Sequence, residues 1–271
     1  DPSGYLLFVI PSVLVSIAFA PILLSISPTP AFESTKRMTL VELYKTSPLG
    51  CVGMFLMGSV FAAQFGMAAV YATEAGLSIG QIPIFTAAFY VGALLFQYPV
   101  GWLSDRADRR KLIALSALIA GLASVMGMVL GANFYILVAA AFLIGGLSNP
   151  LYSLLIAYTN DFLEPDDMAG ASAGLLFVNG LGAIAGPLIT GWAMQGFGPF
   201  AFWLVLAVTF GAVALYALYR MAQRAVTPVA ETDSYLGVLP MSSPVAVEAA
   251  GAWAAEQAEA EREAEGETVP G

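Results

Sequence analysis

The most concentrated chemistry in this sequence is a charged run, Gly101-Trp-Leu-Ser-Asp105-Arg106-Ala-Asp108-Arg109-Arg110-Lys111. Carboxylate and guanidinium groups alternate directly after an apolar stretch, so they can pair with one another. Such pairs are strengthened where they are partly removed from water. The spacing therefore predicts ion pairs within this cluster. The alternative is a simple cluster of positive charge that marks membrane orientation.

Enzymatic chemistry has few candidate residues. The 271 residues contain no histidine and one cysteine, Cys51. The usual general base and commonest metal ligand is therefore missing, and no intramolecular disulfide can form. No pair of acids lies within an apolar stretch. We expect no enzyme, no cofactor and no metal site.

The composition indicates that lipid surrounds most of the chain. Apolar residues make up 59% and charged residues 11%, with a mean hydropathy of +0.80. A soluble domain carries about 25% charged residues. A water-facing surface cannot be built from this composition, so the expected partner is a lipid bilayer and not nucleic acid.

Seven apolar stretches are long enough to cross a bilayer as helices, which takes about 20 residues each. They are Gly4–Ser27, Pro48–Thr73, Gln81–Leu103, Leu112–Gly131, Phe134–Tyr158, Ala169–Gln195 and Phe200–Arg220. Their length and lack of alternation exclude barrel strands. The predicted fold class is all-α, a polytopic helical membrane protein with seven spans.

The basic residues all fall on one side of this arrangement. They lie between spans one and two, between spans three and four, and after span seven: Lys36, Arg37, Lys45, Arg106, Arg109, Arg110, Lys111, Arg220, Arg224 and Arg262. By the positive-inside rule this side is cytoplasmic. We therefore expect a multi-pass protein whose C-terminus is cytoplasmic.

Acidic residues concentrate in two other places. The connection Asn160–Met168 holds Asp161, Glu164, Asp166 and Asp167 on the basic side of the membrane. It can contact the basic loops, or it can be a solvated polar loop. Residues 225–271 carry nine acidic side chains and one basic side chain, a composition that predicts disorder.

Two helices share a pattern that predicts an internal repeat. Gly92-Ala93 is followed by Gly101-Trp102, and Gly182-Ala183 is followed by Gly191-Trp192, ninety residues later. Three spans separate the copies, so equivalent helices cross the bilayer in opposite directions. Inverted repeats of this kind are a construction that secondary transporters use. The two repeats are expected at 48–131 and 134–220.

These features resemble the major facilitator superfamily. The charged run is similar to its motif-A loop, G-x-x-x-D-R-x-G-R-R-K. An inverted pair of three-helix repeats, preceded by an extra helix and a long loop, resembles helix 6 plus helices 7–12 of the twelve-helix fold. The run Tyr158-Thr-Asn160-Asp161-Phe-Leu-Glu164 resembles the YcaD-like bacterial branch.

The resemblance implies secondary active transport of a small-molecule substrate by alternating access, in the plasma (inner) membrane of a bacterium. It divides the chain into four parts. Residues 1–27 are the extra helix, 28–47 the cytoplasmic central loop, 48–222 the six-helix C-terminal bundle, and 223–271 an acidic tail. We then expect a fragment whose partner is the missing N-terminal helical half. The alternative is a non-transporting membrane subunit that binds a partner through the surface that would otherwise meet the missing half.

The resemblance also assigns a gate to the motif-A residues Gly101, Asp105, Arg106, Asp108, Arg109, Arg110 and Lys111. It implies that Asp105 contacts the start of helix 11 near Met168–Ala171, and that Arg109 pairs with a nearby acid. Asp108 stands where the family usually has glycine, which puts the tight turn there in doubt.

Polar residues within the spans are candidates for a substrate cavity between the two halves. They are Gln64, Tyr71, Gln97, Asn149, Tyr152, Ser153 and Asn179. Hydrogen bonding between helices is the alternative role for such residues. Phe65, Phe89 and Tyr90 would join Tyr71 and Tyr152 in an aromatic lining suited to neutral or amphipathic compounds, unless they only pack the core. Gly182, Gly186, Pro187 and Gly191 are predicted to pack helices.

Overall fold

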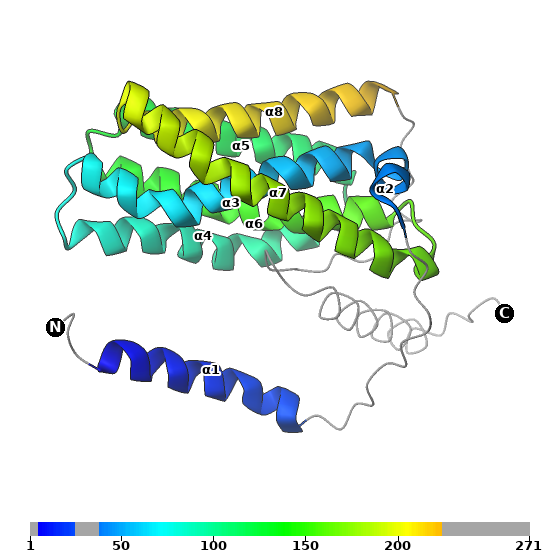
Figure 1. The fold of residues 1–271 in the computed structure, drawn as a ribbon, viewed down its shortest axis with the longest axis horizontal. Helices are drawn as coiled ribbons and strands as arrows, with labels where there is room; N and C mark the ends of the chain where they lie inside the picture. The colour runs from blue at the N-terminus through cyan, green and yellow to red at the C-terminus, as the bar shows by residue number, and fades with distance from the viewer. Residues whose placement is uncertain (1–4, 25–37, 224–271) are drawn as a thin grey trace. The chain divides into compact units, whose positions relative to one another are not determined.

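The computed structural model describes residues 5–24 and 38–223, which form eight helices (Figure 1). The predicted acidic tail falls on residues outside these ranges. The helices are α1 (Leu6–Leu24), α2 (Leu40–Thr46), α3 (Pro48–Glu74), α4 (Gln81–Ser104), α5 (Arg109–Leu130), α6 (Phe134–Asn160), α7 (Pro165–Phe197) and α8 (Ala201–Gln223).

Six of these helices, α3 to α8, are long and apolar enough to cross a membrane. α1 is a further helix of 19 residues whose side chains are almost all apolar. It belongs to a separate compact unit from the bundle and is described by itself. The chain is therefore an all-α, polytopic helical membrane protein.

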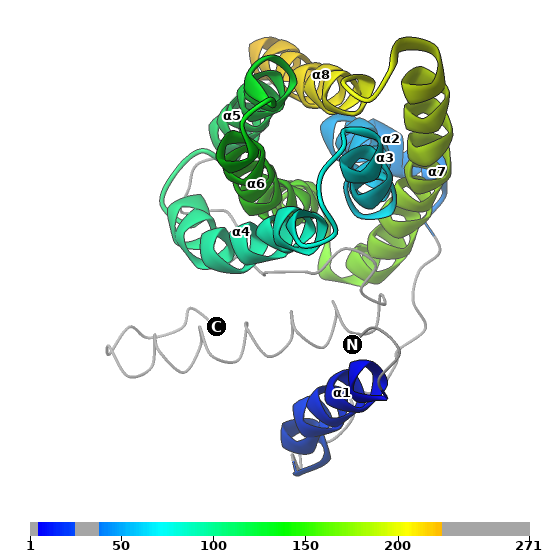
Figure 2. The ribbon, with the colours of Figure 1, turned by 90° about the vertical axis from the view of Figure 1, so that its left-hand side faces the viewer.

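Seen from one end, the helices α3 to α8 are arranged around a common centre (Figure 2). The most extensive contacts run in the order α4, α6, α5, α8, α3 and α7; in addition α3 touches α4 and α6, and α7 touches α8. At the two ends of this order, α4 packs mainly on α6 and α7 mainly on α3. Only 28% of the residues in the membrane-spanning segment of each of these two helices are buried, against 44–61% in the other four helices. We call the exposed side of α3, α4 and α7, away from the α5–α8 pair, the open face.

The packing follows an inverted repeat of α3–α5 and α6–α8. The first helix of each repeat packs on the second helix of the other, and the third helices pack on each other. Glycines at equivalent positions permit this contact. A Cβ atom at Gly58 would overlap the carbonyl oxygen of Asn179, and one at Gly145 would overlap that of Phe89. Phe89 and Asn179 are themselves ninety residues apart.

The glycines that predict the repeat make matching contacts. A Cβ atom at Gly92 would overlap the carbonyl oxygen of Phe142, and one at Gly182 would overlap that of Phe55. Small residues at such points let two helix backbones approach closely. The repeat is therefore present in atomic contacts as well as in sequence.

Two other residues expected to pack helices meet Ser59 of α3. Gly186 lies against the Ser59 backbone, and the Ser59 Oγ donates a hydrogen bond of 3.0 Å to the carbonyl oxygen of Gly182. Pro187 lies inside α7. A Cβ atom at Gly191 would have its nearest neighbour, Met67 Cε, at 3.6 Å, an ordinary contact. Close approach of α3 and α7 thus depends on Gly182 and Gly186 more than on Gly191.

Several helix starts differ from the sequence-based ranges; α5, for example, begins at Arg109 and not at Leu112. α7 begins at Pro165 and not at Ala169, because proline favours the first helical turn and acidic residues there suit the positive end of the helix dipole. α2 lies within the stretch that was predicted to be a loop. Thr39 and Glu42 form a capping box at its start, and Leu43 is buried beside Gly174 of α7.

The core at the end where α4 and α8 begin is built from aromatic rings. Tyr71 of α3 stacks on Phe202 at 4.9 Å between ring centroids and meets the edge of Trp203 at 5.4 Å. Phe85 of α4 lies 5.7 Å from Tyr71 and 5.4 Å from Phe89. All five side chains are buried. We call them the ring cluster; it joins α3, α4 and α8 without a charged group.

Candidate functional site

The other end of the bundle collects the charged residues. α3, α5 and α7 begin there, and α4, α6 and α8 end there, because consecutive helices run in opposite directions. We call it the basic end. It holds Lys45, Arg106, Arg109, Arg110, Lys111 and Arg220 together with Asp105, Asp108 and Asp161.

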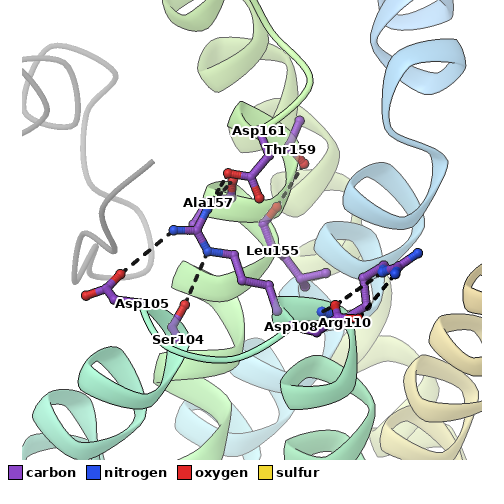
Figure 3. Close-up of polar contacts among 9 residues, drawn as sticks. Ser104, Asp105, Asp108, Arg110, Leu155, Ala157, Thr159 and Asp161 are labelled. Carbon is purple, nitrogen blue, oxygen red and sulfur yellow. Dashed lines mark hydrogen bonds and ion pairs between the residues drawn. The ribbon is translucent and has the colours of Figure 1, made fainter. Parts of the chain in front are cut away.

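Arg109, in the first turn of α5, is the centre of this site, and its side chain is only 3% exposed. Its Nε donates to Ser104 Oγ at 3.3 Å, and its Nη1 donates to the carbonyl oxygen of Ala157 at 3.4 Å. Nη1 also donates to Asp161, and Nη2 lies 3.8 Å from Oδ1 of Asp105. One guanidinium therefore ties the end of α4 and the end of α6 to the start of α5 (Figure 3).

Asp161 is the C-cap residue of α6, and its side chain is also only 3% exposed. Of the two alternatives for the acidic connection, the structure shows a contact with a basic loop, and Asp161 makes it. A buried charge is stable only with a partner, and losing one member of such a pair costs about 3–5 kcal/mol. The Arg109–Asp161 pair thus depends on α5 and α6 staying in place.

A second pair lies to one side of this group (Figure 3). Asp108 caps α5 by accepting the backbone N–H of Arg110 at 3.0 Å, and the Arg110 guanidinium donates to both carboxylate oxygens of Asp108 at 3.2 Å. The backbone φ of Asp108 is −59°, so this position does not require glycine. The doubt about the turn is thereby resolved, because the aspartate starts the next helix.

The electrostatics of Asp108 follow from these contacts. Burial raises the pKa of its carboxyl, but the hydrogen bonds from Arg110 and the charges of Arg110 and Lys111 lower it more strongly. The net result is a pKa below the usual range for aspartate. Asp108 is therefore charged over a wider pH range than a solvated aspartate.

The other motif-A residues lie around these two pairs. Arg106 is exposed, donates to the carbonyl oxygen of Trp102 at 3.1 Å and lies 4.4 Å from the centre of the Trp102 ring. Lys111 is exposed, and Gly101 is buried in the last turn of α4. Asp105 contacts Arg109; its contact with Met168–Ala171 stays a prediction.

The cavity candidates on α3 are buried and face different neighbours. Gln64 Oε1 accepts a hydrogen bond of 3.1 Å from Ser148 Oγ of α6, and Gln64 Nε2 has no partner within the described residues. Tyr71 belongs to the ring cluster. The structure therefore does not bring these two residues together, although they share a helix face.

The candidates on α6 are buried as well. Asn149 Nδ2 donates to the carbonyl oxygen of Gly145, one turn earlier in its own helix, at 3.3 Å. Ser153 Oγ accepts from Gln97 Nε2 of α4 at 3.3 Å. Asn179 of α7 donates to the carbonyl oxygen of Met54 at 3.1 Å. Several of these groups thus join helices to one another, and their contact with substrate stays a prediction.

The sequence did not single out Phe61, yet this ring joins two predicted cavity residues. It meets Tyr152 edge-on at 5.6 Å and stacks on Phe65 at 6.0 Å. Phe65 in turn lies 4.9 Å from the ring of Tyr90. The spacing of Phe61 and Phe65, one helical turn apart, was the available signal.

The fold and the basic end together define a class of protein, a helical membrane protein of two inverted three-helix repeats with a charged cluster at one end. The family model described as the Major Facilitator Superfamily matches residues 49–255. The chain belongs to this superfamily.

Three relatives illustrate the similarity. YfkF of Bacillus subtilis, named as an uncharacterized MFS-type transporter, is 30% identical over 175 residues, which are 62% of this chain and 44% of the relative. YcaD of Salmonella arizonae, also named as an uncharacterized MFS-type transporter, is 26% identical over 234 residues, which are 84% of this chain and 59% of the relative. YcaD of Escherichia fergusonii is 24% identical over 201 residues, which are 73% of this chain and 51% of the relative. The chain spans about half the length of these relatives, and they confirm the YcaD-like resemblance.

Proposed function

We propose that the protein containing this chain carries out secondary active transport of a small molecule by alternating access. The observation that carries this proposal is the inverted repeat, in which Gly58 and Gly145 make equivalent contacts on opposite repeats. Two repeats of opposite orientation allow one structural plan to serve both faces of a membrane. Membership of a superfamily whose named relatives are transporters supports the same reading.

In this proposal the missing N-terminal helical half covers the open face, and α4 and α7 supply most of the contact. Their low burial within the bundle supports this assignment. Substrate then binds between the halves. Of the polar candidates, Gln97 is the one that is only partly buried in the bundle. It is therefore the polar candidate that we favour for direct contact.

The basic end acts as the gate on the cytoplasmic side. Arg109 bridges helices of both repeats, because α4 and α5 belong to the first repeat and α6 to the second. A shift of the repeats would exchange these contacts for contacts with water. The concentration of Lys and Arg at this end supports a cytoplasmic orientation of this end. The bacterial relatives support placement in a bacterial inner membrane.

Alternating access is tested by labelling cysteines at exposed positions toward the two ends of α3. On a Cys51→Ala background of the intact protein in vesicles, Phe55→Cys lies toward the basic end of α3 and Ala69→Cys toward the other end; both positions are exposed. The proposal predicts that a membrane-impermeant maleimide labels Phe55→Cys only from the cytoplasmic side and Ala69→Cys only from the other side. Conditions that increase one rate should decrease the other. Rates that never change in opposite directions would contradict it.

A further inference from the structure

Four aromatic side chains form a continuous line from the bundle interior to the open face. Tyr152 of α6, Phe61 and Phe65 of α3, and Tyr90 of α4 are in ring contact in that order. Their exposed fractions rise along the line, at 2%, 6%, 37% and 60%. We call these four residues the aromatic track. Its inner rings are fixed by packing, whereas its outer rings are exposed on the bundle surface formed by this chain.

The helix geometry places Phe65 on the open face. Phe55, Gly58 and Ser59 form the stripe of α3 that packs on α7, and Phe61 and Gln64 face α6. At 100° per residue, Phe65 lies between these two stripes and away from the side of α3 that meets α8. Tyr90 lies in ring contact with it and therefore opens on the same face.

The two repeats differ at this point although they share their packing glycines. Phe65 and Tyr152 each lie seven residues after the equivalent glycines Gly58 and Gly145, and Phe65 is partly exposed whereas Tyr152 is buried. The position equivalent to Tyr90 in the second repeat, ninety residues later, is Gly180, and a Cβ atom there would have no neighbour within 4 Å. A feature needed only for packing would be expected in both repeats. The exposed outer pair of the track, Phe65 and Tyr90, occurs only in the first repeat, because the equivalent positions hold Tyr152, which is buried, and Gly180.

We propose that Phe65 and Tyr90 bind a planar aromatic solute that is uncharged or carries a delocalised positive charge. This rests on the proposed transport function and names its substrate class. Ring faces carry partial negative charge, so they attract cations and disfavour anions. The charged residues of the described spans all lie near helix ends, so no carboxylate is placed to pair a localised ammonium group at mid-helix.

The site is tested with ethidium, a planar aromatic cation, on the intact protein in phosphatidylcholine nanodiscs. Fluorescence anisotropy measures binding, with empty nanodiscs as the blank. Phe65→Leu and Tyr90→Leu should each weaken binding about fivefold or more, the size of one lost ring contact. Phe55→Leu is the matched control, since Phe55 is exposed to 39% on the same helix but lies outside the track. Phe55→Leu should change the affinity for ethidium less than twofold. Tetrapropylammonium, a cation without aromatic rings, should also change the apparent affinity for ethidium less than twofold when it is added as a competitor.

Other outcomes overturn the assignment. These are the absence of saturable ethidium binding by the unaltered protein, unchanged affinity in both track variants, or an equal loss in Phe55→Leu. A thermal denaturation curve for each variant excludes misfolding as the cause. Saturable ethidium binding without alternating cysteine access would contradict the transport function but would still support the binding site. Alternating access without ethidium binding would contradict the site and leave the function.

Discussion

The two ends of the six-helix bundle are held together by different forces. At the basic end, Arg109 joins three helices through hydrogen bonds and ion pairs to Ser104, Asp105, Ala157 and Asp161. At the opposite end, the ring cluster joins three helices through contacts between aromatic rings, without ion pairs. Ionic contacts are directional and can be exchanged for water, whereas apolar packing is lost only by exposing or emptying the core.

This difference suits a protein that opens at one end of the half-bundle while its helices stay associated at the other. The ring cluster keeps α3, α4 and α8 together as a unit. The Arg109 contacts lie at helix ends, so a shift of those ends would bring the buried charges into water while the ring cluster at the other end stays packed. Four substitutions, ordered by expected effect, test this comparison.

The largest effect is expected for Arg109→Ala, which leaves Asp161 buried without its partner. The free energy of unfolding in mixed micelles should fall by about 3–5 kcal/mol. Lys111→Ala, an exposed cation two residues further along α5, is the control and should cost less than 1 kcal/mol. Equal losses in the two variants would show that the basic end is not stabilised by this buried pair.

Trp203→Leu tests the ring cluster and should cost about 2–3 kcal/mol, less than the 3–5 kcal/mol typical of removing a buried tryptophan entirely. Trp192→Leu on α7 is the matched control, because Trp192 is 70% exposed and Trp203 is 1% exposed. Thermal unfolding in detergent measures both. If Trp192→Leu proved as costly, ring packing at this end would not be what holds the helices.

Asp108→Asn tests the second ionic pair through pH. Because the pKa of Asp108 is lowered in the folded protein, its contribution is present above the unfolded pKa of about 3.9 and is lost as pH falls through the folded pKa. The variant keeps a capping side chain, so the loss at neutral pH should be about 1 kcal/mol. The measurement is unfolding free energy against pH. An unaltered acid dependence in the variant would contradict the assignment.

Arg106→Ala should have the smallest effect, about 0.5 kcal/mol, because its contact with Trp102 is exposed to solvent. Chemical denaturation of the variant beside the unaltered protein measures the difference. A loss above 2 kcal/mol would mean that the exposed cation also supports the basic end.

The inverted repeat could be predicted from the sequence because steric contact fixes its glycines. Gly92 and Gly182 each lie against a partner backbone, where no other residue type fits as closely. The charged motif also predicted an acid beside Arg109. It could not select Asp161, because four acids share the connection and only tertiary packing buries one of them.

The candidate cavity was harder to predict, for a physical reason. Helical periodicity gives the face of a residue but not the helix that it meets. Gln64 and Tyr71 share a face, yet one bonds to α6 and the other packs on α8. The short helix α2 was missed for another reason, since its capping residues Thr39 and Glu42 lie in a polar stretch without a long apolar run.

The most direct test of the proposed gate at the basic end is the labelling rate of Phe55→Cys in the intact protein, with and without Asp105→Asn. Removing the Asp105 charge weakens its contact with Arg109, so the account predicts faster cytoplasmic labelling of Phe55→Cys and slower labelling of Ala69→Cys from the opposite side. Arg106→Ala should leave both rates unchanged. Identical rates at both positions in Asp105→Asn and the unaltered protein would contradict the account.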